Sequence, residues 1–285
     1  MPQPIIAPLA FLLLFVALGV ALIAAPAQKM RLASGSLCLS LALAGMAGLV
    51  GREALPALLL GGLLTLLART ATRSSLRGGA LTGLAVWCIA AGFPALPGFS
   101  PLPWLEDFGR HHQSLRWHYD KGLAGLLLLM ALPARTTAPG RPFDGLWALP
   151  AGALAIVACS LSLGLASLAP RWLPGFPLWL AGNLFLTVIA EEAFFRGLLQ
   201  ARLQAWFAHR HGGSASYATP AAVAVTALLF GLVHLGWGWP FAAMAVLAGL
   251  FYGAMAGREM RLGRAIAAHV LTNASLILLT HSPLG

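Results

Sequence analysis

The run LWLAGNLFLTVIAEEAFFRGLLQ, residues 178–200, is an apolar segment that carries Glu191-Glu192 and, four residues later, Arg196. The chain has eight acidic residues, and the others lie in expected loops or at the ends of apolar segments. A carboxylate at bilayer depth is costly unless it is paired, so an ionisable residue inside a membrane segment indicates a functional site by default. The two glutamates are therefore the first candidates for chemistry in this sequence.

The composition is that of a membrane protein. Of 285 residues, 59% are hydrophobic and only 9% are charged, with a mean hydropathy of +0.82, whereas soluble domains carry about 25% charged residues. The formal net charge of +10 comes from basic residues in short loops between apolar runs, a pattern typical of topology determinants. The sequence predicts the lipid bilayer as a partner and argues against nucleic acid.

Apolar runs divide nearly the whole chain, and a helix needs about 20 such residues to cross the bilayer. They predict an all-α fold, a polytopic transmembrane helical bundle of about 8–10 spans. The first run follows MPQP without a basic leader and is interpreted as a retained span. Ten helices are expected, at residues 5–25, 32–50, 54–68, 79–97, 122–134, 146–168, 177–205, 219–237, 240–257 and 264–281.

The longest polar segment is Pro101–Lys121, PLPWLEDFGRHHQSLRWHYDK. Its aromatic residues suit an interfacial helix or loop. His111, His112 and His118 raise the question of a metal site, but they lie in a polar, Arg-containing stretch. A surface segment is the favoured interpretation.

Helical spacing separates the polar residues of the first run into two sets. Residues four apart share a face of an α-helix, so Glu192 is expected to face Arg196 and to be neutralised by it. Glu191 lies about 100° away and is expected to be the carboxylate available as a general base.

Two later apolar segments carry polar residues of their own, Phe230-Gly-Leu-Val-His234 and His269-Val-Leu-Thr-Asn273. His269 and Asn273 project from one helical face, and such a pair can polarise a carbonyl and donate to a developing oxyanion. Phe230, one turn before His234, could wall the site. Spans centred in the bilayer would place the two histidines at different depths, so a common site requires short or broken helices around a wet cavity.

The three motifs resemble those of the CPBP (Abi) family of intramembrane proteases, which includes the type II CAAX prenyl endopeptidases. Glu191 to Arg196 matches EExxxR, Phe230 to His234 matches FxxxH, and His269 to Asn273 matches HxxxN, in that order along the chain. The resemblance covers roughly residues 175–280. It implies a catalytic helical core at 171–285, preceded by a transmembrane region of unknown role at 1–170.

The resemblance implies an endopeptidase that hydrolyses a peptide bond in a membrane-associated protein or peptide. Glu191 would activate water with the help of His234, while Glu192 and Arg196 would order the site. His269 and Asn273 would support the oxyanion, and Phe230 would contact the substrate.

Metal dependence is left open. No cofactor is expected, and the chain lacks the HExxH motif of zincins. Glu191, His234 and His269 could still supply three zinc ligands.

The basic residues also predict an orientation. Most of the 18 Lys and Arg residues fall in cytoplasmic loops if both termini lie outside. Arg202 then follows Glu191 into an inside loop, and Arg264 precedes His269 from another, which predicts a site that opens toward the cytoplasmic side. The Arg-rich composition fits the inner membrane of a high-GC bacterium, where prenylated CAAX substrates are not expected.

Two other functions compete with the protease. One is a non-enzymatic immunity or scaffold protein of the same fold, against which the intact motifs argue. The other is a proton-coupled transporter, because intramembrane Glu and His side chains relay protons. The absence of strongly repeated halves argues mildly against it.

Overall fold

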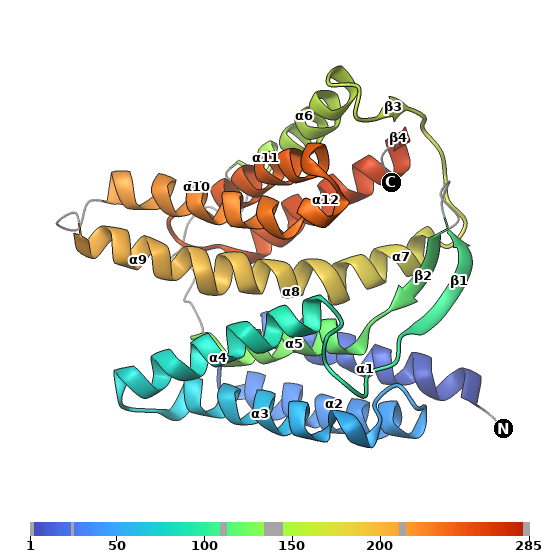
Figure 1. Ribbon diagram of the computed structural model, residues 1–285, viewed down its shortest axis with the longest axis vertical. Coiled ribbons are helices and arrows are strands. Elements are labelled where there is room, and N and C mark those ends of the chain that lie inside the picture. Colours follow the sequence, from blue (N-terminus) through green and yellow to red (C-terminus); the bar gives the residue numbers. More distant parts are fainter. Residues whose placement is uncertain (1–2, 24–25, 109–112, 134–144, 211–214, 282–285) are drawn as a thin grey trace. The chain divides into compact units, whose positions relative to one another are not determined.

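The computed structural model describes residues 3–23, 26–108, 113–133, 145–210 and 215–281, and almost all of its regular structure is helical (Figure 1). Each of the ten helices expected from the sequence has a counterpart, which confirms the all-α class. In chain order the elements are α1 (Gln3–Ile23), α2 (Pro26–Met46), the 3₁₀ turn η1 (Arg52–Ala54), α3 (Leu55–Thr70), α4 (Ser74–Gly92), β1 (Leu102–Phe108), β2 (Gln113–Trp117), α5 (Tyr119–Ala131), α6 (Ala148–Ser162), β3 (Ser167–Leu168), α7 (Phe176–Gly182), the π-helix η2 (Asn183–Val188), α8 (Ile189–Glu192), the π-helix η3 (Ala193–Gln200), α9 (Ala201–Arg210), α10 (Ala215–Val233), the 3₁₀ turn η4 (Leu235–Trp237), α11 (Trp239–Ala256), α12 (Leu262–Leu279) and β4 (Thr280–His281).

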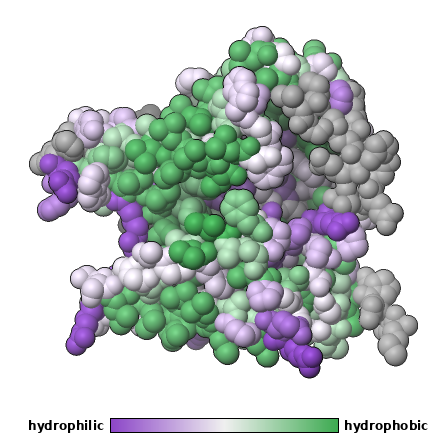
Figure 2. Space-filling view, viewed as in Figure 1, coloured by the Kyte–Doolittle hydropathy of each residue, from purple (hydrophilic) through white to green (hydrophobic). Residues whose placement is uncertain are grey.

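The chain is a multi-pass membrane protein. Within the described residues, six helical stretches are long and apolar enough to cross a bilayer, and two more apolar helices are shorter. Large aliphatic side chains face outward along these helices, such as Leu59, which is 73% exposed, and Leu232, which is 57% exposed. Figure 2 shows broad hydrophobic areas over the helices. Soluble monomers rarely expose contiguous apolar patches of this kind.

The chain divides into two compact units, which are interleaved along the sequence. The first comprises residues 1–106, 114–135 and 181–194, and the second comprises residues 107–113, 136–180 and 195–285. Two boundaries fall inside the helical stretch Phe176–Arg210, one between Leu180 and Ala181 and one between Phe194 and Phe195. The predicted division at residue 170 into an N-terminal region and a catalytic core stays a prediction.

Helix α5 forms the centre of the first unit. Its sequence GLAGLLLLMA is apolar on every side, as expected for a helix surrounded by protein, and α1, α3, α4 and the η2–α8 segment pack around it. Gly125 lets α8 approach closely, because a Cβ atom there would lie 3.0 Å from the Cα atom of Ala190. The segment that carries the two glutamates is thereby held against α5.

Most of the described part of the polar segment Pro101–Lys121 is extended, as β1 and β2, so the expectation of an interfacial helix or loop is wrong for these residues. β1 and β2 pair in a two-stranded sheet. Trp117 is buried, with its ring 4.7 Å from that of Trp104 and 5.2 Å from that of Phe11 on α1. These aromatic contacts, which join residues far apart in the sequence, favour strands here over an interfacial helix.

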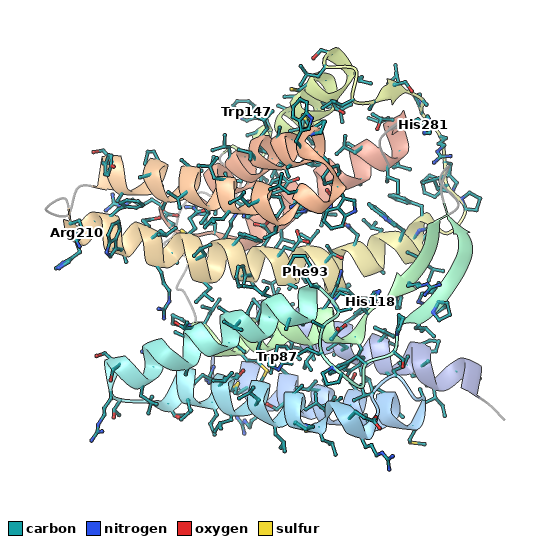
Figure 3. All side chains as sticks on the ribbon, viewed as in Figure 1. Trp87, Phe93, His118, Trp147, Arg210 and His281 are labelled. Atoms are coloured by element: carbon teal, nitrogen blue, oxygen red, sulfur yellow. The ribbon has the colours of Figure 1, made fainter. Side chains whose placement is uncertain are left out.

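Of the three histidines in that segment, the structure describes only His118. His111 and His112 lie outside the residues that the structure describes. His118 is half-buried between β2 and α5 (Figure 3). Burial lowers the pKa of His118, and the nearby charges of Lys121 and Arg116 lower it further. This histidine is therefore mainly neutral at pH 7.

In the second unit, α10, α11 and α12 pack in sequence order, and α6 covers α11 and α12. Gly152 of α6 makes room for the ring of Phe251. β3 and β4 pair antiparallel, with Ser167 opposite His281 and Leu168 opposite Thr280, so the chain before α7 is joined to the end of α12. Figure 3 places His281 at that end of α12.

Candidate active site

The two glutamates lie on α8, a four-residue α-helical segment between two π-helical stretches, η2 and η3. π-Helical turns are rare in proteins and occur frequently at functional sites. In η3 the backbone bonds run from residue i to i+5, so the α-helical spacing assumed from Glu192 to Arg196 does not hold. The pairing of these two residues, derived from that spacing, stays a prediction.

Burial distinguishes the two glutamates. Glu192 is fully buried, at 0% exposure, whereas Glu191 is half-buried. Both belong to the first unit, where α8 packs against α5. A half-buried carboxylate can meet water, which is the requirement for the base role expected of Glu191, and a fully buried one suits the ordering role expected of Glu192.

Arg196 is a buried cation of the second unit, with 1% of its surface exposed. Its Nη2 atom donates to the carbonyl oxygen of Gly249 on α11, at 3.1 Å. Its Cζ atom lies 5.3 Å from the ring centroid of Phe230 and 5.7 Å from that of Tyr252. Attraction between a cation and aromatic faces at this range stabilises a charge that has left water. Arg196 therefore fixes η3 against α10 and α11.

The ring of Phe230 contacts the histidines of the second and third motifs. Its ring is buried, and its centroid lies 4.5 Å from that of His234 and 5.8 Å from that of His269. Phe195, the residue before Arg196, meets the same ring edge-on at 5.0 Å. Three predicted site residues of the second unit, Arg196, His234 and His269, thus surround the ring of a fourth, Phe230.

The end of α10 places His234 beside that ring. α10 ends at Val233, four residues before the predicted end at 237, and η4 follows. Gly238 then turns the chain with φ of +96°, a conformation that favours glycine, before α11 begins. This break supplies the interruption that a common site for the two histidines was expected to need.

The tautomer of His234 follows from a backbone contact of its ring. Its Nδ1 atom lies 2.6 Å from the carbonyl oxygen of Phe230. Because a carbonyl oxygen only accepts, Nδ1 carries a proton, and in the neutral form of the ring the lone pair lies on Nε2. Nε2 is therefore the nitrogen of His234 that can accept a hydrogen bond from water or substrate.

His269 is 4% exposed and stacks on Tyr252 of α11, with ring centroids 4.3 Å apart and an interplanar angle of 17°. Asn273 follows one turn later on the same α-helix and is half-buried. α12 has α-helical spacing over this stretch, so the two residues share a face as predicted.

Two polar residues of this region were missed from the sequence. Tyr252 is one of only three tyrosines and lies inside an apolar span, which was the available signal. Gln200 is fully buried and donates from Nε2 to the carbonyl oxygen of Gly253, at 3.2 Å. Its place as a polar residue at the end of the apolar run 178–200 could have suggested it.

The close packing of α10 on α11 depends on Gly231, inside the FxxxH motif. A Cβ atom there would lie 2.8 Å from the carbonyl oxygen of Ala242 and closer still to Val246. We expect Gly231→Ala to destabilise the protein by about 1–3 kcal/mol, the usual range for overpacking. The measurement is thermal unfolding in detergent micelles.

Gly263→Ala, in the first turn of α12, is the matched control, because nothing lies within 4 Å of a Cβ atom at that position. It should leave stability unchanged or raise it slightly, since alanine favours the helix over glycine. Equal melting temperatures for the two variants would contradict the proposed tight contact between α10 and α11.

Within the described part of the chain, no three His, Cys, Asp or Glu side chains gather closely enough to hold a metal ion. The zinc alternative built on Glu191, His234 and His269 therefore stays a prediction.

Residues 170–275 match the family described as type II CAAX prenyl endopeptidase Rce1-like. This region of the chain is therefore similar to that family. The match includes all three motifs, from Glu191 to Asn273. No curated protein and no solved structure matches the chain. The family match indicates an enzyme of the protease type in a multi-pass membrane protein.

Proposed function

We propose that the chain is an intramembrane endopeptidase that hydrolyses a peptide bond in a membrane-associated protein or peptide. The observation that carries the proposal is the packing of His234 and His269 against the single ring of Phe230. Two motifs separated by more than a helix thereby supply their polar groups to one place, inside a region that matches an endopeptidase family.

In the proposed reaction, Glu191 accepts a proton from water while the water oxygen bonds to the carbonyl carbon of the substrate. Nε2 of His234 accepts a hydrogen bond from the second O–H of that water and so orients it, and this hydrogen stays on the oxygen. The tetrahedral intermediate then collapses, the C–N bond breaks, and Glu191 returns its proton to the leaving amine. One carboxyl group thus serves as base and then as acid.

The negative charge that develops on the carbonyl oxygen needs donors already in place. His269 and Asn273 supply them from one face of α12. Arg196 and Glu192 do not touch the reacting atoms in this proposal, and they order the helix that carries Glu191. Phe230 forms the apolar wall against which the substrate lies.

The reaction is tested on the purified protein in lipid nanodiscs. The probes are a solubilised membrane-protein extract and a pool of internally quenched peptides, some with a C-terminal prenylated cysteine. We expect new protein N-termini and a gain of fluorescence. Wild-type protein that produces neither, relative to a blank with Glu191→Gln, would overturn the protease assignment and favour the non-enzymatic or transporter alternative.

We further propose a bacterial inner membrane location with the site open to the cytoplasm. In a background without Cys38, Cys88 and Cys159, Ala205→Cys on α9 should react with an impermeant thiol reagent only from the cytoplasmic side. Gly236→Cys in η4 should react only from outside. Both positions are exposed, so access depends on the side of the membrane. The reverse pattern would overturn the orientation, and labelling of both from one side would overturn the alternation of loops.

A further inference from the structure

Helix α11 carries none of the three motifs, yet it provides a buried residue at the centre of the candidate site. Tyr252 is 1% exposed. Its ring stacks on the imidazole of His269, with centroids 4.3 Å apart and planes 17° apart, and the Cζ atom of Arg196 lies 5.7 Å from its centroid. One side chain of α11 therefore contacts a residue of the first motif and a residue of the third.

We infer that Tyr252 is a positioning residue for the protease site, so this inference rests on the proposed function. Its ring holds the plane of the His269 imidazole and supports the guanidinium of Arg196. Phe230 closes the arrangement from α10, at 6.2 Å from the ring of Tyr252 and 5.8 Å from that of His269. An imidazole between two aromatic rings keeps one plane, which is what a donor to an oxyanion requires.

The backbone on both sides of Tyr252 is held by close contacts and hydrogen bonds, so its ring has a defined position next to His269. Gly249 and Gly253 flank it and let neighbouring chains come close, because Cβ atoms there would lie 3.1 Å from the Cα atom of Ala227 and 3.0 Å from Oε1 of Gln200. Arg196 and Gln200 each donate to the carbonyl oxygen of one of these glycines, at 3.1 and 3.2 Å. This stretch of α11 is thus tied to η3 at two points, one helical turn apart.

The size of the effect follows from geometry. A displacement of about 1 Å in a catalytic group can cost about 10²-fold in rate. Replacement of the Tyr252 ring by a branched aliphatic chain fills much of the space but removes the flat surface that fixes His269. We therefore expect Tyr252→Leu to lower kcat by about 10²-fold and to change KM little, because the substrate-contacting surface at Phe230 is retained.

The experiment compares Tyr252→Leu with Tyr252→Phe, which keeps the ring. Turnover is measured on the best-cleaved peptide of the quenched pool. In parallel, ¹H–¹³C spectra of histidine-labelled protein in nanodiscs report the ring-current shift that Tyr252 imposes on His269, with the signal assigned by its loss in His269→Gln. We expect Tyr252→Leu to lose both the shift and the turnover, and Tyr252→Phe to keep the shift and most of the turnover.

Leu250→Ala is the control, because Leu250 lies on the same helix and is 38% exposed. It should keep the His269 shift and the wild-type kcat. Wild-type kcat in Tyr252→Leu, or an unchanged His269 signal in that variant, would overturn the inference. If the wild-type protein cleaves nothing, the proposed function fails, and the spectra still decide whether Tyr252 orients His269.

Discussion

Glu191→Gln is expected to abolish peptide cleavage while the protein still inserts and folds. Glutamine keeps the shape of the side chain but cannot accept a proton from water. Loss of a general acid–base group costs about 10²–10⁴-fold, and this proposal uses one carboxyl group for both proton transfers. The measurement is the rate of fluorescence gain from the quenched peptides, with thermal unfolding recorded on the same preparation.

Glu192→Gln separates the two adjacent carboxylates. Glu192 is fully buried and Glu191 is not, so we expect Glu192→Gln to lower the melting temperature as well as the rate. A buried charge left without its expected partner costs about 3–5 kcal/mol, here the charge of Arg196. If Glu192→Gln were inactive and fully stable while Glu191→Gln kept its activity, the two roles would be exchanged.

The second large effect is expected at the polar residues of the later motifs. His234→Ala, His269→Ala and Asn273→Ala should each lower kcat/KM by about 10²-fold or more, the scale for losing a base partner or an oxyanion donor. Because these residues act on one transition state, the effects should be far from additive. Single and double variants are compared on one peptide under subsaturating conditions.

His209→Ala supplies the control for histidine removal. His209 is exposed in the last turn of α9, next to Arg210, which Figure 3 labels at that end of the helix. We expect its kcat/KM to equal that of the wild type. A His234/His269 double variant whose loss equalled the product of the single losses would show that the two histidines serve separate purposes, against a shared site.

The sequence by itself determined the helical class and singled out the candidate site residues along the chain. Runs of apolar residues long enough to span a bilayer have few alternatives to helix, because backbone groups inside lipid must satisfy their hydrogen bonds within the segment. The match of residues 170–275 to an endopeptidase family agrees with the resemblance read from three short motifs. Charged residues are costly in such segments, so the position of Glu191 and Glu192 within one was enough to make them candidate site residues.

Only the tertiary structure decided the local backbone structure of these segments and the contacts between them. β1 and β2 form because rings distant in sequence, such as those of Trp117 and Phe11, pack together, and no local pattern encodes that contact. The hydrogen bonds of η3 are π-helical, so the α-helical spacing that was used to pair Glu192 with Arg196 does not apply there. Tyr252 lies beside His269 because α10, α11 and η3 approach closely at glycines. The sequence shows that these residues are small, but it does not show which neighbours they contact.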